Sequence, residues 1–121
     1  MVGWFEIPVA DMNRAKLFYE SVFKIEISLH DFGGLKMGWF PGGITNKGAS
    51  GTLVQHKMYR PSATDGVLIY FSCADVSNEL NRVVAAKGQI MQPKTEIGGN
   101  HGFMALIHDT EGNRIALHSQ V

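Results

Sequence analysis

The sequence contains the same pattern twice. The pentapeptide IPVAD ends at Asp11 and introduces an amphipathic run, and FSCAD ends at Asp75, 64 positions later, and introduces a second one. In a chain of 121 residues each copy is too small to bury a sufficient core alone, so the copies are expected to share one. We therefore predict a single domain over residues 1–121, with a first module at about 1–60 and a second at about 65–121.

Each module is predicted to contain a strand, a helix and three further strands. Apolar residues recur at helical spacing after each aspartate, and apolar–polar alternation or glycine-rich turns mark the strands. Gly88 is expected to end the second helix in a left-handed conformation. The predicted helices span 12–23 and 76–87, and the predicted strands span 4–9, 25–30, 35–40, 51–56, 67–73, 89–92, 103–108 and 114–119.

The fold class that follows is α+β. Two βαβββ modules placed side by side form a curved, open eight-stranded mixed sheet with both helices outside. Alternate residues of the central strands then line the concave side of the sheet, which we call the cup. On this geometry the cup is the candidate binding pocket.

Charge and composition exclude several classes of function. Eleven Lys and Arg residues balance eleven Asp and Glu residues, which predicts neither nucleic acid nor a membrane surface as a partner. The apolar run 67–71 is far too short to span a bilayer. Cys73 is the single cysteine, so an internal disulfide and a zinc site of several thiolates are excluded. Because no leader-like segment precedes the first strand, we expect a cytoplasmic globular protein.

Two motifs accompany the repeat. V-x-D followed by F-Y runs from Val9 to Tyr19, and the hairpin sequence DTEGNRI occupies 109–115. With the repeat, they resemble the vicinal oxygen chelate superfamily, which includes glyoxalase I, extradiol dioxygenases, fosfomycin-resistance enzymes and bleomycin-resistance proteins. The resemblance covers nearly the whole chain and implies a small molecule bound in the cup of a homodimer. Residues 4–9, 51–54 and 93–98 resemble still more closely a bacterial branch of this superfamily, whose members are described as related to lactoylglutathione lyase.

Catalytic members of that superfamily hold a divalent metal ion with His and Glu side chains that face the cup. Carried onto this sequence residue by residue, three of the four ligand positions fall on Trp4, Leu68 and Ala116, and the fourth falls near Thr52. None of these side chains is a good ligand for a divalent metal. We therefore expect the usual metal site to be absent and no cofactor to be bound. The resemblance also places Lys24 where the family has the glycine that ends the first helix, and a left-handed Lys costs about 1 kcal/mol.

The residues left to recognise a ligand are those that the strands turn toward the cup. Trp4 and Glu6 alternate onto one face of the first strand. Tyr70 and His118 are expected to face the cup from the second module, and His101 lies in a glycine-rich turn that could lie at its mouth. We predict that Trp4 and Tyr70 stack on the ligand, and that Glu6 and His118 give polar recognition.

Bland alternatives accompany these assignments. Glu6 could form a salt bridge where the modules meet, and His118 and His101 could be structural or surface residues. Glu6 with His118, His56 or His101 could also form a displaced divalent metal site, although no tight ligand spacing supports it. Outside the cup we expect Trp39 in the core, His30 and His108 facing solvent, and a mobile flap over 42–51.

The sequence therefore predicts a metal-independent protein that binds a small, largely apolar or aromatic molecule in the cup. The alternative is a lyase- or isomerase-type enzyme in which Glu6 acts as general base, with His118 as a second candidate catalytic residue. A third possibility is sequestration of a toxic compound in a groove formed by two chains.

Overall fold

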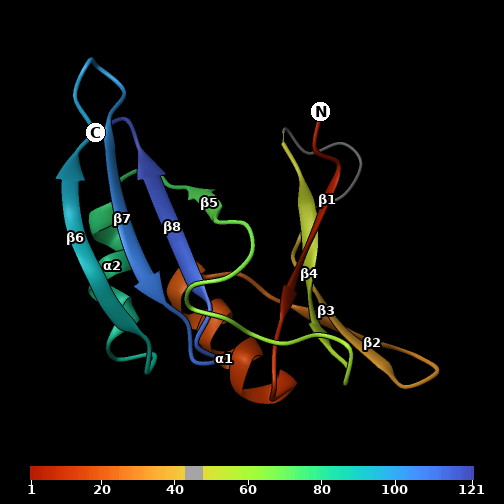
Figure 1. Ribbon diagram of the computed structural model, residues 1–121. Helices are drawn as coiled ribbons and strands as arrows, with labels where there is room; N and C mark the ends of the chain where they lie inside the picture. The colour runs from red at the N-terminus through yellow and green to blue at the C-terminus, as the bar shows by residue number, and fades with distance from the viewer. Residues whose placement is uncertain (43–47) are drawn as a thin grey trace. The chain divides into compact units, whose positions relative to one another are not determined.

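The computed structural model describes residues 1–42 and 48–121. The chain forms two compact units, Met1–Pro61 and Ser62–Val121. Each contains a four-stranded sheet and one helix in the order strand, helix, three strands (Figure 1). The predicted α+β class with two βαβββ modules is confirmed. The flap predicted over 42–51 falls mainly on 43–47, which lie outside the described residues.

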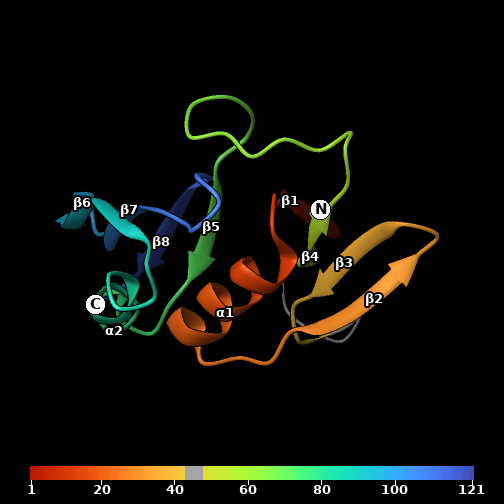
Figure 2. The ribbon, with the colours of Figure 1, turned by 90° about the horizontal axis from the view of Figure 1, so that it is seen from below.

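The first unit contains a mixed sheet in the order β1-β4-β3-β2. β1 runs parallel to β4, whereas β2 and β4 are antiparallel to β3. Figure 2 shows β2 and β3 as a hairpin and α1 beside this sheet. The elements are β1 (Trp4–Pro8), α1 (Met12–Phe23), β2 (Ser28–Phe32), β3 (Leu35–Trp39) and β4 (Ser50–Gln55).

The core of the first unit lies between α1 and one face of the sheet. Asp11 caps the helix by accepting a hydrogen bond from the Arg14 N–H at 3.1 Å. Gly38 lets the helix approach β3, because a Cβ there would lie 2.9 Å from Met12 Sδ and from Ile27 Cγ2. The buried apolar residues of this unit are Ile7, Val9, Met12, Ala15, Phe18, Tyr19, Val22, Ile27, Phe40, Leu53 and Val54.

The second unit repeats this topology in the order β5-β8-β7-β6, with β5 parallel to β8. Asp75 caps α2 and accepts a hydrogen bond from the Ser77 N–H at 2.8 Å. That bond and an ion pair with Lys94 at 3.0 Å lower the pKa of Asp75. The elements are β5 (Ile69–Ser72), α2 (Val76–Val83), β6 (Gln89–Glu96), β7 (Phe103–His108) and β8 (Arg114–Ser119).

The hairpin of the DTEGNRI motif is held by two buried polar side chains. The carboxylate of Asp109 accepts hydrogen bonds from the Glu111 N–H at 2.9 Å and from the Asn113 N–H at 2.8 Å. The amide of Asn113 donates to Asp109 at 3.0 Å and accepts from the Ser62 N–H at 3.1 Å. The motif therefore stabilises the hairpin and connects it by a hydrogen bond to Ser62, the first residue of the second unit.

Both helices are followed by a lysine in the left-handed conformation. Lys24 caps α1 at φ 56° and ψ 50°, as predicted. The prediction that Gly88 would play this part after α2 is wrong, because the positive φ, 74°, belongs to Lys87. The Gly88 N–H bonds the Val83 carbonyl and the Lys87 N–H bonds the Val84 carbonyl, both at 2.9 Å. In this pattern the penultimate residue, here Lys87, turns left-handed.

Two strand boundaries differ from the prediction by three residues or more. β2 begins at Ser28 rather than at residue 25, because the Ile27 N–H donates to the Glu20 carboxylate at 2.9 Å instead of to a neighbouring strand. β6 continues past Pro93, which an edge strand with register shifts tolerates. In the described part of the chain, no helix has the length and apolar character needed to cross a membrane.

Candidate ligand-binding surface of the first sheet

The face of the first sheet opposite α1 carries several of the predicted site residues. Gly38 faces α1, so its neighbour Trp39 faces away from the helix. The strand register pairs Glu6 with Thr52 and Thr52 with Trp39, and paired residues lie on the same side. We call this side, which Trp4 and Glu6 share, the open face.

Four aromatic side chains from three strands gather on the open face. The ring of His30 stacks on Trp39 with centroids 3.8 Å apart, and Phe32 lies 6.2 Å from both rings. Trp4 meets Trp39 edge-on at 6.3 Å. We call Trp4, His30, Phe32 and Trp39 the aromatic platform. Because Trp4 is 46% and Phe32 55% exposed, part of the platform is accessible for stacking on a planar molecule.

Glu6 lies beside the platform with two hydrogen-bond donors around its carboxylate. Its Oε1 accepts from the Tyr59 hydroxyl at 3.0 Å, and its Oε2 accepts from the Trp4 indole N–H at 3.4 Å. The hydrogen bond to Glu6, and then its charge, raise the pKa of Tyr59, because both favour the protonated phenol. The long bond to Trp4 leaves Oε2 able to accept from a ligand.

The four metal-ligand positions implied by the resemblance do not fit a metal ion. Trp4 and Thr52 lie on the open face, Ala116 is buried on β8, and Leu68 stands just before β5. An indole, a hydroxyl and two alkyl groups are a poor donor set for a divalent cation. Within neither unit, over the residues described, do three His, Cys, Asp or Glu side chains come together in a way that could hold a metal.

The second unit brings together two of its three predicted site residues. The Nε2 of His118 lies 2.7 Å from the carbonyl oxygen of His101. A carbonyl can only accept, so this ring nitrogen carries the proton and donates. Tyr70 is 52% exposed on β5, where it pairs with Ala116, and Ser72 on the same strand pairs with His118. Tyr70 and His118 therefore share one face of the second sheet.

Cys73 lies directly after β5 and is half-buried. Burial, and then the nearby Glu79 carboxylate, raise the pKa of the Cys73 thiol to about 12. A thiol with so high a pKa is protonated at neutral pH and is a poor nucleophile or metal ligand.

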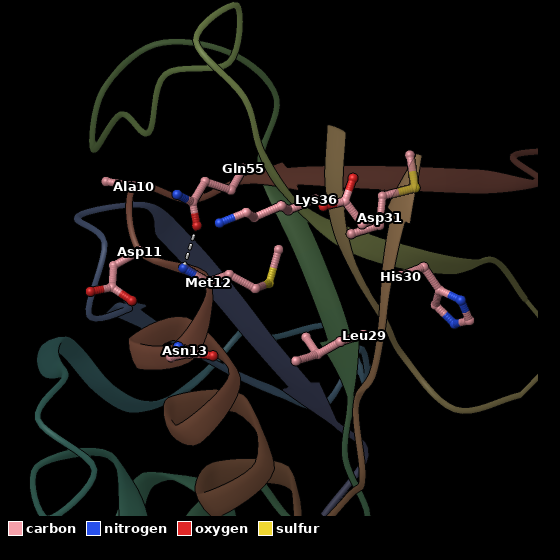
Figure 3. A pocket seen from close by; sticks show the side chains of 10 residues that line it. Ala10, Asp11, Met12, Asn13, Leu29, His30, Asp31, Lys36 and Gln55 are labelled. Carbon is pink, nitrogen blue, oxygen red and sulfur yellow. Dashed lines mark hydrogen bonds between the residues drawn. The ribbon is translucent and has the colours of Figure 1, made fainter. Parts of the chain in front are cut away.

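Two adjoining hollows lie outside the predicted site. The first, of about 510 Å³, lies between the start of α1 and the β2–β3 hairpin (Figure 3). In it the Gln55 side chain accepts a hydrogen bond from the Met12 N–H at 2.7 Å. The second, of about 620 Å³, shares Ala10, Lys36 and Gln55 with the first and continues along the chain after β4.

Sequence reasoning missed part of the platform. His30, expected to face solvent, is half-buried against Trp39, and Trp39, expected in the core, lies on the open face. The hairpin at Gly33-Gly34 contained the signal, because its register pairs His30 with Met37, two residues from Trp39. Tyr59 lies outside any periodic pattern, and no comparable signal indicated it.

Comparisons with known proteins bear on the whole chain. The sequence model of the Glyoxalase/Bleomycin resistance protein/Dioxygenase superfamily matches residues 1–117. A comparison with curated protein sequences gave no match.

Solved structures with the same fold include three whose sequence identities are low. TnmS3, an antibiotic binding protein from Streptomyces sp. CB03234, is 22% identical, with 98% of this chain and 94% of that chain covered and a TM-score of 0.67. A glyoxalase-related enzyme from Fulvimarina pelagi is 12% identical, with 98% and 87% covered and a TM-score of 0.74. A glyoxalase I mutant from Zea mays is 16% identical with a TM-score of 0.72, and 98% of this chain spans 45% of that one.

Proposed function

Because this chain belongs to the Glyoxalase/Bleomycin resistance protein/Dioxygenase superfamily, we propose that it binds a small, planar, largely apolar molecule on the open face without a metal ion. The observation that supports this proposal is the aromatic platform, a partly exposed cluster of rings beside a carboxylate. The cup predicted from the sequence would present this face to the ligand.

The platform suits a planar ligand for physical reasons. His30 stacks on the ring of Trp39 and Trp4 makes a T-shaped contact with it, so this ring is ordered before a ligand arrives. Preordered rings lose little conformational entropy on binding. Aromatic stacking contributes about 0.5–1.5 kcal/mol for each ring pair beyond the burial of apolar area, which itself contributes about 25 cal/mol per Å².

Glu6 would supply polar recognition. Its carboxylate accepts hydrogen bonds only, so it selects a ligand with an O–H or N–H at the edge of its ring. Tyr59 orients the carboxylate through the 3.0 Å hydrogen bond. Recognition would depend on stacking and hydrogen bonding, since the family's metal-ligand positions hold Trp4 and Thr52 in this unit.

The second unit carries the other predicted ligand-binding residues. We propose stacking by Tyr70 and polar contacts by His118 and His101. We propose a cytoplasmic homodimer as the functional form. The antibiotic binding protein that shares this fold supports binding as the primary function.

An enzymatic function is the second candidate, and one observation favours it. The Glu6 carboxylate accepts a hydrogen bond from the Tyr59 hydroxyl, an arrangement in which a base and a proton donor stand side by side. In this case the chain would be a lyase or isomerase with Glu6 as general base. A Glu6→Gln variant keeps the shape of the side chain and removes the base.

The two tryptophans of the chain, Trp4 and Trp39, both belong to the platform, so their indole N–H signals in ¹H–¹⁵N spectra report on it. We expect 2-naphthol, a planar ring system with one O–H, to shift both signals in chelator-treated protein. Trp39→Leu should weaken this binding about tenfold, equivalent to about 1.4 kcal/mol. Leu17→Ala, a change of an exposed apolar residue on α1, should leave it unchanged.

Three outcomes separate the candidates. If 2-naphthol moves neither indole signal, or if binding requires an added divalent cation, the proposal of metal-independent binding on this face is wrong. Loss of turnover of a substrate by Glu6→Gln with retained binding would favour the enzyme. Weaker binding by Glu6→Gln with no turnover in either protein would favour the binding function.

A further inference from the structure

The second hollow lies at the end of the first sheet. Its walls come from the residues after β1, from the β2–β3 turn and Lys36 at the start of β3, and from the end of β4 with the segment that follows it, 55–61. Its volume of about 620 Å³ is that of a small-molecule pocket. Figure 3 shows Lys36 extended toward Gln55, at the boundary of the two hollows.

The charge of this hollow is of one sign. Lys36, Lys57 and Arg60 line it, and no Asp or Glu does. None of the three side chains has an ion pair or hydrogen bond with another residue that the structure describes. The whole chain has as many acidic as basic residues, so this local excess does not reflect general basicity.

Three cations elsewhere in the chain are paired. Lys16 lies 2.9 Å from Glu20, Arg82 lies 3.5 Å from Glu79, and Lys94 lies 3.0 Å from Asp75. Three like charges around one hollow repel each other, and a bound anion would relieve that repulsion. The hollow therefore differs from these paired sites, because three cations line it and no Asp or Glu does.

Neutral hydrogen-bond donors add to the cations. His56 lines the hollow, and its Nδ1 accepts the Met58 N–H at 3.1 Å, so in the neutral ring the proton is on Nε2. The guanidinium of Arg60 can bind two oxygens of one carboxylate or phosphate at the same time. Ammonium, guanidinium and imidazole donors together suit an oxyanion.

Tyr59 connects the hollow with the open face. Its side chain lines the hollow, its ring lies 6.2 Å from that of His56, and its hydroxyl donates to Glu6 beside the aromatic platform. A ring on the platform and an acidic group in the hollow can therefore belong to one molecule.

We infer that the hollow binds the oxyanion group, a carboxylate or a phosphate, of the same small molecule whose ring occupies the aromatic platform. The identity of that molecule rests on the proposed function, whereas the binding of an oxyanion depends only on Lys36, Lys57 and Arg60 and their neighbours.

The first test uses inorganic phosphate and acetate, titrated separately at constant ionic strength. Phosphate or acetate is expected to shift the backbone amide signals of 56–60 saturably. A Lys57→Gln/Arg60→Gln double variant should weaken this binding about fivefold or more. Lys24→Gln removes a charge from an exposed lysine outside the hollow and serves as the matched control.

The second test compares 2-naphthol with 6-hydroxy-2-naphthoate, which adds a carboxylate to the same ring system. The wild-type protein should bind the naphthoate about fivefold more tightly, and the double variant should bind both compounds alike. Equal affinity of the wild-type protein for both would overturn the inference that one molecule fills platform and hollow.

The two proposals fail in different ways. If 2-naphthol shifts the indole signals but neither anion shifts 56–60, the oxyanion site is wrong and the proposed function stands. If the anions shift the amide signals of 56–60 and 2-naphthol shifts no indole signal, the oxyanion site stands and the proposed function is wrong. Equal losses in Lys24→Gln and the double variant would show an effect of surface charge and overturn the site. Binding to anionic phosphatidylglycerol vesicles without a response to free anions would overturn the small-molecule assignment.

Discussion

Trp39 is the residue around which the candidate site is organised. It is half-buried, His30 stacks on its ring, and Trp4 makes a T-shaped contact with it. Its indole N–H points at the Met37 sulfur at 3.5 Å, a weak acceptor. The ring is therefore held in position by ring contacts and one weak hydrogen bond. A ring held in this way can stack on a ligand without rearrangement.

The hydrogen bond between Glu6 and Tyr59 is expected to be visible in a pH titration. The pKa of Tyr59 is raised, so the phenol stays protonated and donates until the pH rises through that raised pKa. In Glu6→Gln the phenol loses its charged acceptor, and its pKa should fall toward the ordinary value. Titration of the tyrosine ¹³Cζ signals measures the change. An unchanged Tyr59 pKa in Glu6→Gln would contradict the hydrogen bond.

Cys73 is expected to be inert in the folded protein. With a pKa raised to about 12, the thiol is protonated at about pH 8, and iodoacetamide should modify it only after unfolding in urea. Because burial and Glu79 disfavour the thiolate, the stability of the folded state is expected to fall as the pH rises from the ordinary thiol pKa toward about 12. Mass spectrometry of native and unfolded samples checks the reactivity. Rapid native modification would contradict the burial of Cys73.

At the scale of residues, the sequence predicted which side chains lie together only within a strand. Alternation alone made Trp4 and Glu6 neighbours on one face, and the structure places them in contact. Tyr59 reaches Glu6 because a turn after β4, in which its N–H bonds the His56 carbonyl at 2.9 Å, folds the chain back. Such a turn has no periodicity, so the contact could not be predicted.

At the scale of elements, the end of each helix is a point of strain. Lys24 and Lys87 both have positive φ, a conformation in which the Cβ of an L-residue crowds the following carbonyl. Neither helix is ended by the glycine that makes this turn without cost. The chain accepts this strain twice, at equivalent places in its two units.

Lys24→Gly is therefore expected to stabilise the protein by about 1 kcal/mol, because glycine adopts φ 56° without steric cost. Urea denaturation should show a higher midpoint with an unchanged slope. Lys24→Ala keeps a Cβ in the left-handed conformation and is the control, for which no stabilisation is expected. A lower midpoint for Lys24→Gly would contradict the strain.

Elements were more predictable than contacts. Helical spacing after Asp11 and Asp75 located both helices, since Asp side chains cap them as expected. The start of β2 was not predictable from alternation, because Ile27 is buried with the periodicity of a strand while its N–H is taken by Glu20. A side chain seven residues earlier thus decides where the strand begins.

At the scale of the whole molecule, each unit has an edge strand that contributes to the parallel pairing. Among the residues that the structure describes, β1 is paired only with β4, and β5 only with β8. Exposed strand edges are places where a second chain can pair. The two edges occupy equivalent positions in the repeat, so both are candidate surfaces for pairing with a second chain.

We expect the protein to be a homodimer in solution. Multi-angle light scattering after size-exclusion chromatography should give twice the 13.3 kDa mass of one chain. A proline at position 70 would remove the N–H of a β5 residue, so Tyr70→Pro should shift the mass toward that of a monomer if this edge takes part. Tyr70→Phe, which keeps the N–H, should remain dimeric. A single-chain mass for the wild-type protein at all concentrations would refute the dimer.

The hairpin from Asp109 to Asn113 limits what sequence similarity can say about the function of this chain's homologues. Its buried carboxylate and amide are occupied with one another and with the Ser62 N–H, far along the chain from the hairpin itself. These hydrogen bonds support the fold, and they do not depend on which ligand binds to the sheets. Sequence similarity in this hairpin therefore indicates a shared fold, and the function of each homologue depends on residues elsewhere in its chain.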